Sequence, residues 1–156
     1  MDVKEAKKLS FELMESSKAI YLTTIDSEGY PITRAMFNLR NIEQFPEFSK
    51  FFNELENPFE IYISTNTASS KTSHIKKNPK ISVYFCEPEL FKGVMFGGDV
   101  EFIKDKNIKR QIWLDWWDKY YLKGLEDPDY TLFRLKPKVA HVYYKLQKVV
   151  FNPGVD

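Results

Sequence analysis

The chain has one cysteine, six glycines and almost no net charge. The single thiol of Cys86 cannot form an intrachain disulfide or a cysteine-rich metal cluster, which is typical of a protein kept in a reducing cytoplasm. A formal charge of +1 at pH 7 gives no strong field for nucleic acid or a membrane surface. No run of about 18 apolar residues occurs, and residues 1–5 are polar and mixed in charge, so we expect neither a membrane span nor a signal peptide.

The familiar signatures of catalysis and nucleotide binding are missing too. There is no P-loop and no Gly-x-Gly-x-x-Gly. His74 and His141 are far apart, with no acidic cluster at ligand spacing, so no metal site is expected. We interpret His74 as a surface histidine, His141 as a packed or rim histidine, and Cys86 as a small buried hydrophobe. No catalytic residue can be assigned from spacing.

What the sequence does contain is enough chain for a core and many flat rings. A length of 156 residues predicts one domain over 1–156. Aromatic residues make up 16% of the chain, enough to fill a core and also line a pocket or an interface.

Hydrophobic periodicity and turn signals predict a mainly β (α+β) protein. We expect helices over residues 3–17, 70–77 and 106–122. The pattern of residues 40–58 is ambiguous and allows either a loop or a short helix over 47–55. We expect strands over residues 19–25, 31–39, 59–64, 81–86, 91–104, 130–135 and 139–145, and a loosely held tail over 146–156. Strands joined by hairpins indicate an antiparallel barrel or sandwich with peripheral helices.

A run of hydroxyl and amide side chains follows the strand that ends near Ser64, and a helix is expected to begin at Ser69 or Ser70. Lys71 then lies in the first helical turn, where the helix dipole already places partial positive charge. A cation there is favourable if an anion is held by free backbone N–H groups, hydroxyls and the ammonium. The pattern is equally typical of a serine cap beside a solvated lysine.

Arg34 lies in the middle of a predicted strand and shares one face with Ile32 and Met36. A guanidinium there suits a bidentate phosphate contact, but also a salt bridge or a hydrated barrel rim. If Arg34 and Lys71 converge, the two cations and nearby hydroxyls match a phosphate dianion.

The predicted helix 106–122 carries unusually many aromatic rings. We assign Trp113 and Trp116 to core packing. Trp117 and Tyr121 are then the candidates for a subunit interface or a planar ligand.

Several segments occur in the order and spacing of a known family. They are residues 22–31 (LTTIDSEGYP), 33–36 (TRAM), 62–66 (YISTN), 69–71 (SSK), 78–83 (NPKISV) and 98–105 (GDVEFIKD), followed by Trp113 and by 127–130 (DPDY). Over about residues 5–145 the chain resembles the FMN-binding split-barrel family, in the pyridoxamine 5′-phosphate-oxidase-like branch that includes general stress proteins.

This resemblance implies a six-stranded antiparallel Greek-key split β-barrel with peripheral helices, and a homodimer that binds FMN in clefts between subunits. It implies a flavin phosphate held by a strand arginine, by hydroxyls after the third strand and by a Ser-Lys pair opening a helix. Carried onto this chain, these residues are Arg34, Thr65, Ser70 and Lys71. Met36 would lie near the ribityl chain or the ring, and Gln111 and Trp113 are candidates contributed by the partner subunit.

The function implied is that of an FMN-dependent oxidoreductase acting on an unidentified small molecule. The oxidases proper hold pyridoxal phosphate with a C-terminal strand carrying arginine and histidine, and no such strand follows Tyr143-Tyr144, so pyridoxamine phosphate oxidation itself is not expected. One alternative is a protein that binds or senses flavin, deazaflavin or haem without turnover. Another is an interaction module with an empty cleft.

Overall fold

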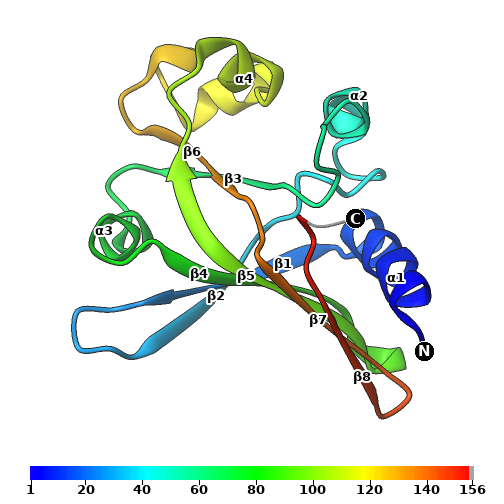
Figure 1. Ribbon diagram of the computed structural model, residues 1–156. Helices are drawn as coiled ribbons and strands as arrows, with labels where there is room; N and C mark the ends of the chain where they lie inside the picture. The colour runs from blue at the N-terminus through cyan, green and yellow to red at the C-terminus, as the bar shows by residue number, and fades with distance from the viewer. Residues whose placement is uncertain (155–156) are drawn as a thin grey trace.

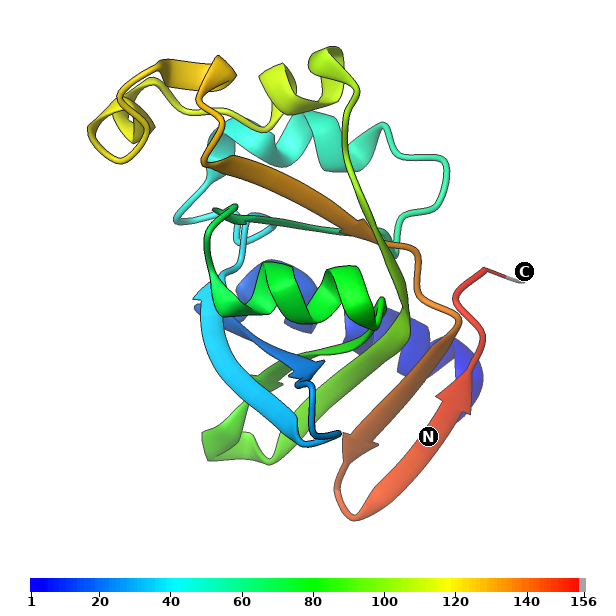
Figure 2. The same cartoon turned by 90° about the vertical axis from the view of Figure 1, so that its left-hand side faces the viewer.

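The computed structural model describes residues 1–154 and shows a half-barrel of antiparallel strands with helices around it (Figures 1 and 2). Six strands follow the path β2-β1-β4-β5-β6-β3, and β7 and β8 continue the sheet from β5. The fold class predicted from the sequence, an antiparallel split barrel, is confirmed. The strands are β1 (Ala19–Ile25), β2 (Pro31–Phe37), β3 (Ile61–Asn66), β4 (Lys80–Glu87), β5 (Lys92–Phe102), β6 (Tyr130–Leu135), β7 (Val139–Tyr144) and β8 (Gln147–Phe151). The α-helices are α1 (Val3–Ser16), α2 (Ser49–Asn53), α3 (Ser70–Lys77) and α4 (Lys106–Gln111), and the 3₁₀ segments are η1 (Pro46–Phe48), η2 (Pro88–Leu90), η3 (Asp115–Lys119) and η4 (Gly124–Glu126).

The β1–β2 hairpin fixes which side chains of β2 face the interior. Its turn is held by Asp26, whose carboxylate accepts from the backbone N–H groups of Glu28 and Tyr30, each at 2.9 Å. The resulting register pairs Leu22 with Arg34 and Ile20 with Met36. Because Ile20 and Leu22 are buried, Arg34 and Met36 lie on the inner face of the sheet.

The main core lies between α1 and the inner face of the sheet. Helix α1 begins with a capping box, in which Asp2 and Glu5 each accept the backbone N–H of the other. Its buried stripe includes Leu9 and Leu13, which recur at helical spacing.

A second core covers the other end of the barrel, where α2 and α4 lie at the top of Figure 1. It joins the 39–55 segment, through Phe48 and Phe52, to Ile112, Trp117 and Tyr130. The segment between the second and third strands therefore packs mainly against the region from residue 103 to 132.

The predicted continuous helix 106–122 is wrong. Helix α4 ends at Gln111, and a 3₁₀ turn begins only at Asp115. The Tyr130 hydroxyl donates to the carbonyl of Ile112 at 2.6 Å. A continuous helix would use that carbonyl for the N–H of Trp116, so a tertiary hydrogen bond replaces a helical one.

This break also changes where the tryptophan rings lie. Trp116 is 47% exposed, so its predicted role in core packing is wrong. Trp117 and Tyr121 are largely buried, and their predicted role at a subunit interface or a planar ligand stays a prediction. Trp113 is partly buried against the second core, as predicted. The break turns the 3₁₀ segment so that different rings face inward.

Two smaller predictions also fail. The tail was expected to be loosely held, but residues 147–151 form β8, which pairs with β7 from Ala140 to Tyr144. Cys86 is only half-buried, because it alternates with the fully buried Phe85 on β4.

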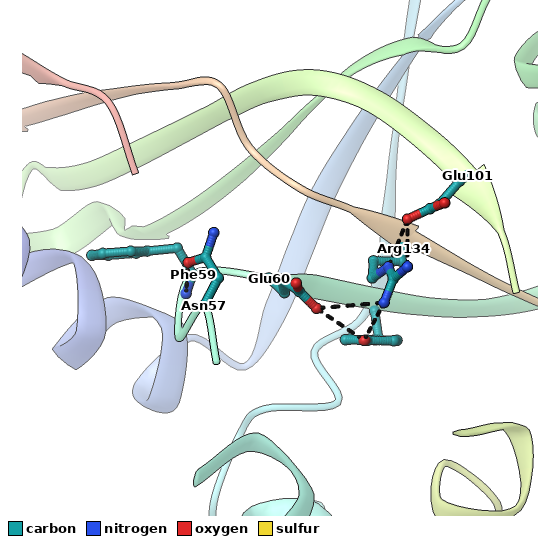
Figure 3. A network of polar contacts seen from close by, with 6 residues as sticks. Asn57, Phe59, Glu60, Glu101 and Arg134 are labelled. Atoms are coloured by element: carbon teal, nitrogen blue, oxygen red, sulfur yellow. Dashed lines mark hydrogen bonds and ion pairs between the residues drawn. The ribbon is translucent and has the colours of Figure 1, made fainter. Parts of the chain in front are cut away.

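A polar network links three neighbouring strands under the second core (Figure 3). Arg134 on β6 lies opposite Tyr62 on β3 and Glu101 on β5. Its guanidinium contacts Glu101 at 2.6 Å and Glu60 at 3.8 Å, and the Tyr62 hydroxyl donates to Glu60 at 3.0 Å. These contacts tie the three strands together where the sheet curls.

None of the helices within residues 1–154 is both long and apolar enough to cross a bilayer.

Candidate functional site

A cavity of about 670 Å³ lies where the barrel is split, between the edge strands β2 and β3. Most of its lining comes from residues 35–37 of β2, from the end of β3 with the start of α3, and from the aromatic segment 117–121. In both views of the fold α3 lies between the β1–β2 hairpin and β3 (Figures 1 and 2). The cavity volume is within the range of small-molecule sites.

One end of the cavity carries positive charge. Lys71, in the first turn of α3, lines the cavity. Burial lowers the pKa of Lys71, and the nearby charge of Arg34 lowers it further. Burial also lowers the pKa of the Arg34 guanidinium. Within residues 1–154 no carboxylate forms an ion pair with either side chain, so two cations face one another without a counter-charge.

Hydroxyl groups surround the same end. Thr65, which is 5% exposed, lines the cavity at the end of β3. Ser69 is the N-cap residue of α3 but makes no side-chain cap bond; its hydroxyl pairs with that of Thr72 at 3.1 Å. The N–H groups of Thr72 and Ser73 donate to the Ser69 carbonyl at 3.2 and 3.4 Å, whereas those of Ser70 and Lys71 have no helical acceptor.

The loop between β3 and α3 is braced by the segment before β6. Asp129 accepts from the Asn66 side chain at 2.6 Å and from the Ala68 N–H at 3.1 Å, and these bonds hold the pKa of its carboxyl below the usual range. Thr67 donates to the carbonyl of Pro128 at 2.8 Å. The brace fixes the chain that precedes Lys71.

Apolar and aromatic side chains also line the cavity: Met36 of β2, and Trp117, Tyr120 and Tyr121 of the aromatic segment. Gln44 and the exposed Lys18 complete the lining. An anion beside Lys71 and a flat ring against the aromatic side chains match this lining.

The predicted site residues are thus only partly brought together. Met36, Thr65 and Lys71 line the cavity; Arg34 adjoins it through Ala35, and Ser70 precedes Lys71 without lining it. Gln111 is exposed on α4, and Trp113 packs on Trp117, Tyr121 and Tyr130 in the second core, so neither faces the cavity of its own chain. The cofactor roles of all seven residues stay predictions.

Sequence reasoning missed two residues beside Arg34. Buried Thr24 lies within 2.8 Å of Arg34 Nη1 and 2.9 Å of His74 Nδ1. His74, interpreted as a surface histidine, is half-buried and holds this contact across 50 residues of sequence. No local spacing signals such a pair.

Among the described residues, no three His, Cys, Asp or Glu side chains are grouped so that they could hold a metal ion.

The fold is a split barrel, and its cavity is lined by Lys71 with Arg34 nearby. The family model for pyridoxamine 5′-phosphate oxidase matches residues 7–144. The chain therefore belongs to the pyridoxamine 5′-phosphate oxidase family. No curated protein matches the chain.

Solved structures agree with this membership. One is a protein from Clostridium acetobutylicum related to general stress protein 26 of B. subtilis, of the pyridoxinephosphate oxidase family; it is 30% identical, with a TM-score of 0.75, over 97% of this chain and 96% of the other. General stress protein 26 from Bacillus anthracis str. Sterne is 17% identical, with a TM-score of 0.68, over 93% of this chain and 98% of the other. A heme binding protein from Mycobacterium smegmatis is 14% identical, with a TM-score of 0.70, over 96% of this chain and 58% of the other. The last two similarities show the fold alone.

Proposed function

We propose that this protein binds FMN at the split of its barrel and uses it as an oxidoreductase acting on a small molecule. The observation that carries the proposal is the pair of cations, Arg34 and Lys71, without a counter-charge among the described residues at one end of a cavity with an aromatic far wall. The phosphate would lie between these cations and the Thr65 hydroxyl. The isoalloxazine would lie against Met36 and the aromatic wall.

The residues present fit that group. A phosphate dianion matches an ammonium and a guanidinium that share one end. A planar ring system matches the apolar side chains of Met36 and Trp117, which exclude water from a ring face. FMN supplies hydride or electron transfer when bound, and the protein's own residues bind it, orient it and exclude water from its isoalloxazine ring. No side chain needs to act as a general acid or base for this.

We propose that the working form is a homodimer, as the family resemblance implies. The outer face of the sheet carries a row of paired side chains across six strands, which we call the outer row: Ala35, Tyr21, Tyr84, Met95, His141 and Val150. Tyr21 is 39% exposed and Val150 is 48% exposed. Ala35 belongs to the outer row and also lines the cavity. A second copy covering this face would therefore reach the rim of the cavity, from which its own Gln111 and Trp113 are the candidate contacts.

The expected location is the cytoplasm, a prediction that rests on the single cysteine. Pyridoxamine phosphate itself is not the proposed substrate, because β8 carries Gln, Lys, Val, Val and Phe rather than arginine and histidine.

The proposal is tested by titrating the purified full chain with FMN and with riboflavin, which lacks the phosphate. Lys71→Ala should lower FMN affinity about tenfold or more, because it removes a charge-assisted contact, and should leave riboflavin affinity unchanged. Lys76→Ala is the matched control, since Lys76 is an exposed lysine on the same helix. Equal FMN affinity in the wild type and Lys71→Ala would overturn the phosphate site. Anaerobic bleaching of the bound flavin by NADH or NADPH then separates a reductase from a protein that only binds flavin.

A haem-binding role is the second candidate, because a structural neighbour is a heme binding protein. Haem iron needs an axial ligand, usually histidine, cysteine, methionine or tyrosine. Neither His74 nor His141 lines the cavity, which leaves Met36 and the tyrosines of the aromatic wall. Titration with hemin, followed by the Soret band, distinguishes this role from flavin binding.

A further inference from the structure

Thr24 is a fully buried threonine whose hydroxyl joins two side chains from different elements. It lies on β1, is 0% exposed, and contacts Arg34 of β2 and His74 of α3. A buried hydroxyl between a guanidinium and an imidazole has its donor and acceptor roles restricted by the partners.

The chemistry of the three groups sets the direction of the hydrogen bonds. A guanidinium can only donate, so Thr24 Oγ1 accepts from Arg34 Nη1 at 2.8 Å. In the His74 tautomer that carries its proton on Nε2, the hydroxyl hydrogen donates to Nδ1, 2.9 Å away. Aligned bonds of this kind polarise and strengthen one another.

The same bonds leave one edge of Arg34 for a ligand. Nη1 also donates to the carbonyl of Ile32 at 2.9 Å and, more weakly, to that of Leu22 at 3.4 Å. All three bonds use Nη1. Within residues 1–154 the Nε and Nη2 atoms make no hydrogen bond, so this edge of the guanidinium is available for a bidentate phosphate contact.

His74 also connects this network to the other cation. It lies three residues after Lys71 on α3, so the two side chains leave neighbouring positions on one helix face. Arg34 on the hairpin is thus bonded, through Thr24, to the helix that carries Lys71.

We propose that Thr24 and His74 are positioning residues that fix the Arg34 guanidinium relative to Lys71, so that the two cations fit one phosphate. This inference rests on the proposed FMN site. It predicts that substitution of Thr24 or His74 reduces the preference for FMN over riboflavin. A merely structural role would lower both affinities alike.

The experiment compares FMN and riboflavin affinities for the full chain by fluorescence titration. Thr24→Val should weaken FMN binding about three- to tenfold and leave riboflavin binding unchanged. The reason is that Arg34, the residue proposed to bind the phosphate, loses its hydrogen bond to the Thr24 hydroxyl. Thr24→Ser keeps the hydroxyl and should stay near the wild type. Ser10→Ala, which removes another buried hydroxyl bond within α1, should change neither affinity.

His74 gives a second, independent variant if Thr24→Val does not fold. His74→Phe removes the acceptor and should weaken FMN binding selectively, whereas His74→Asn keeps an acceptor near the Nδ1 position and should restore part of it. In an Arg34→Met background, Thr24→Val should have no further effect on the ratio of the two affinities.

The outcomes separate the two proposals. If the wild type does not prefer FMN to riboflavin, the phosphate site fails, and this inference fails with it. If Arg34→Met removes that preference while Thr24→Val and His74→Phe keep it, the FMN site stands and the positioning role is overturned. A parallel loss of both affinities in Thr24→Val and His74→Phe also overturns it.

Discussion

Single residues of this protein carry buried polar groups whose protonation depends on their neighbours. Tyr62 is 3% exposed, and burial, as the largest cause, raises its pKa to about 12. Its hydroxyl donates to Glu60 and accepts from Arg134 at 3.3 Å. Loss of the hydroxyl proton would place a second negative charge beside Glu60, so the native fold resists this ionisation.

The alkaline stability of the protein should therefore depend on Tyr62. The ordinary tyrosine pKa is 10.0, and the folded value is higher, so the native state keeps its proton where the unfolded chain loses it. The stabilisation is complete below about pH 10 and is lost as the pH rises towards 12. Urea unfolding across this range should show a falling free energy, and Tyr62→Phe should make the fall shallower.

Tyr30→Phe is the control for this experiment, because Tyr30 is 63% exposed in the hairpin turn. If the free energy of unfolding falls with pH equally steeply in Tyr62→Phe and in the wild type, the prediction is contradicted.

The two cations of the candidate site could be predicted from the chemistry of single residues, whereas their buried partners could not. The sequence points to Arg34 and Lys71 because a guanidinium among apolar residues of a strand needs a polar partner and a cation at a helix start is unfavourable without an anion. The structure brings them near enough for the charge of one to lower the pKa of the other. Thr24 and His74 could not be found in this way, since their contact depends on how α3 packs on β1.

At the level of elements, most strands could be predicted from alternating apolar residues and turn residues. The structure of the region after α4 could not be predicted in this way. The stripe of Ile108, Ile112, Trp113 and Trp116 predicted one long helix. The fold instead breaks it at a carbonyl that Tyr130 uses. Strand β8 was missed because its five residues, QKVVF, are too short and irregular to signal a strand, which forms by pairing with β7.

Trp116 and Trp117, which are adjacent in η3, test whether the predicted helix 106–122 is broken, because the break buries one ring and exposes the other. Trp117 is 2% exposed and packs on Phe48 and Tyr130 in the second core. Trp117→Ala should lower the free energy of unfolding by about 3–5 kcal/mol, because it leaves a large cavity. Trp116→Ala should cost less than about 1 kcal/mol, because that ring is largely exposed.

Urea denaturation followed by far-ultraviolet circular dichroism measures both variants. A larger loss for Trp116→Ala than for Trp117→Ala would support the continuous helix and contradict the structure.

For the whole molecule, the outer row is the surface on which the proposed homodimer depends. It crosses six strands with apolar and aromatic side chains on the face opposite α1. Covering the exposed apolar surface of this row with a partner would be favourable, because apolar area is removed from water.

Met95→Glu should therefore convert the proposed homodimer to a monomer, since Met95 lies in the middle of the outer row and a buried carboxylate pair is costly. FMN affinity should fall with it if the partner completes the cavity. Light scattering coupled to size-exclusion chromatography gives the mass. Val3→Glu is the control, because Val3 is 47% exposed on α1, away from the outer row. A wild type that elutes as a monomer would refute the dimer.

The split of the barrel has a consequence for redesign. The cationic end belongs to the hairpin and α3, whereas the aromatic wall belongs to η3 and the residues that follow it. These parts are contributed by segments far apart in the chain and packed in different cores. A library randomised at Tyr120, which is 55% exposed, would sample new ring partners while the anchor for the phosphate tail keeps its geometry. Under the proposed function, selectivity for the reacting molecule can thus change with little effect on the residues proposed to bind the phosphate of FMN.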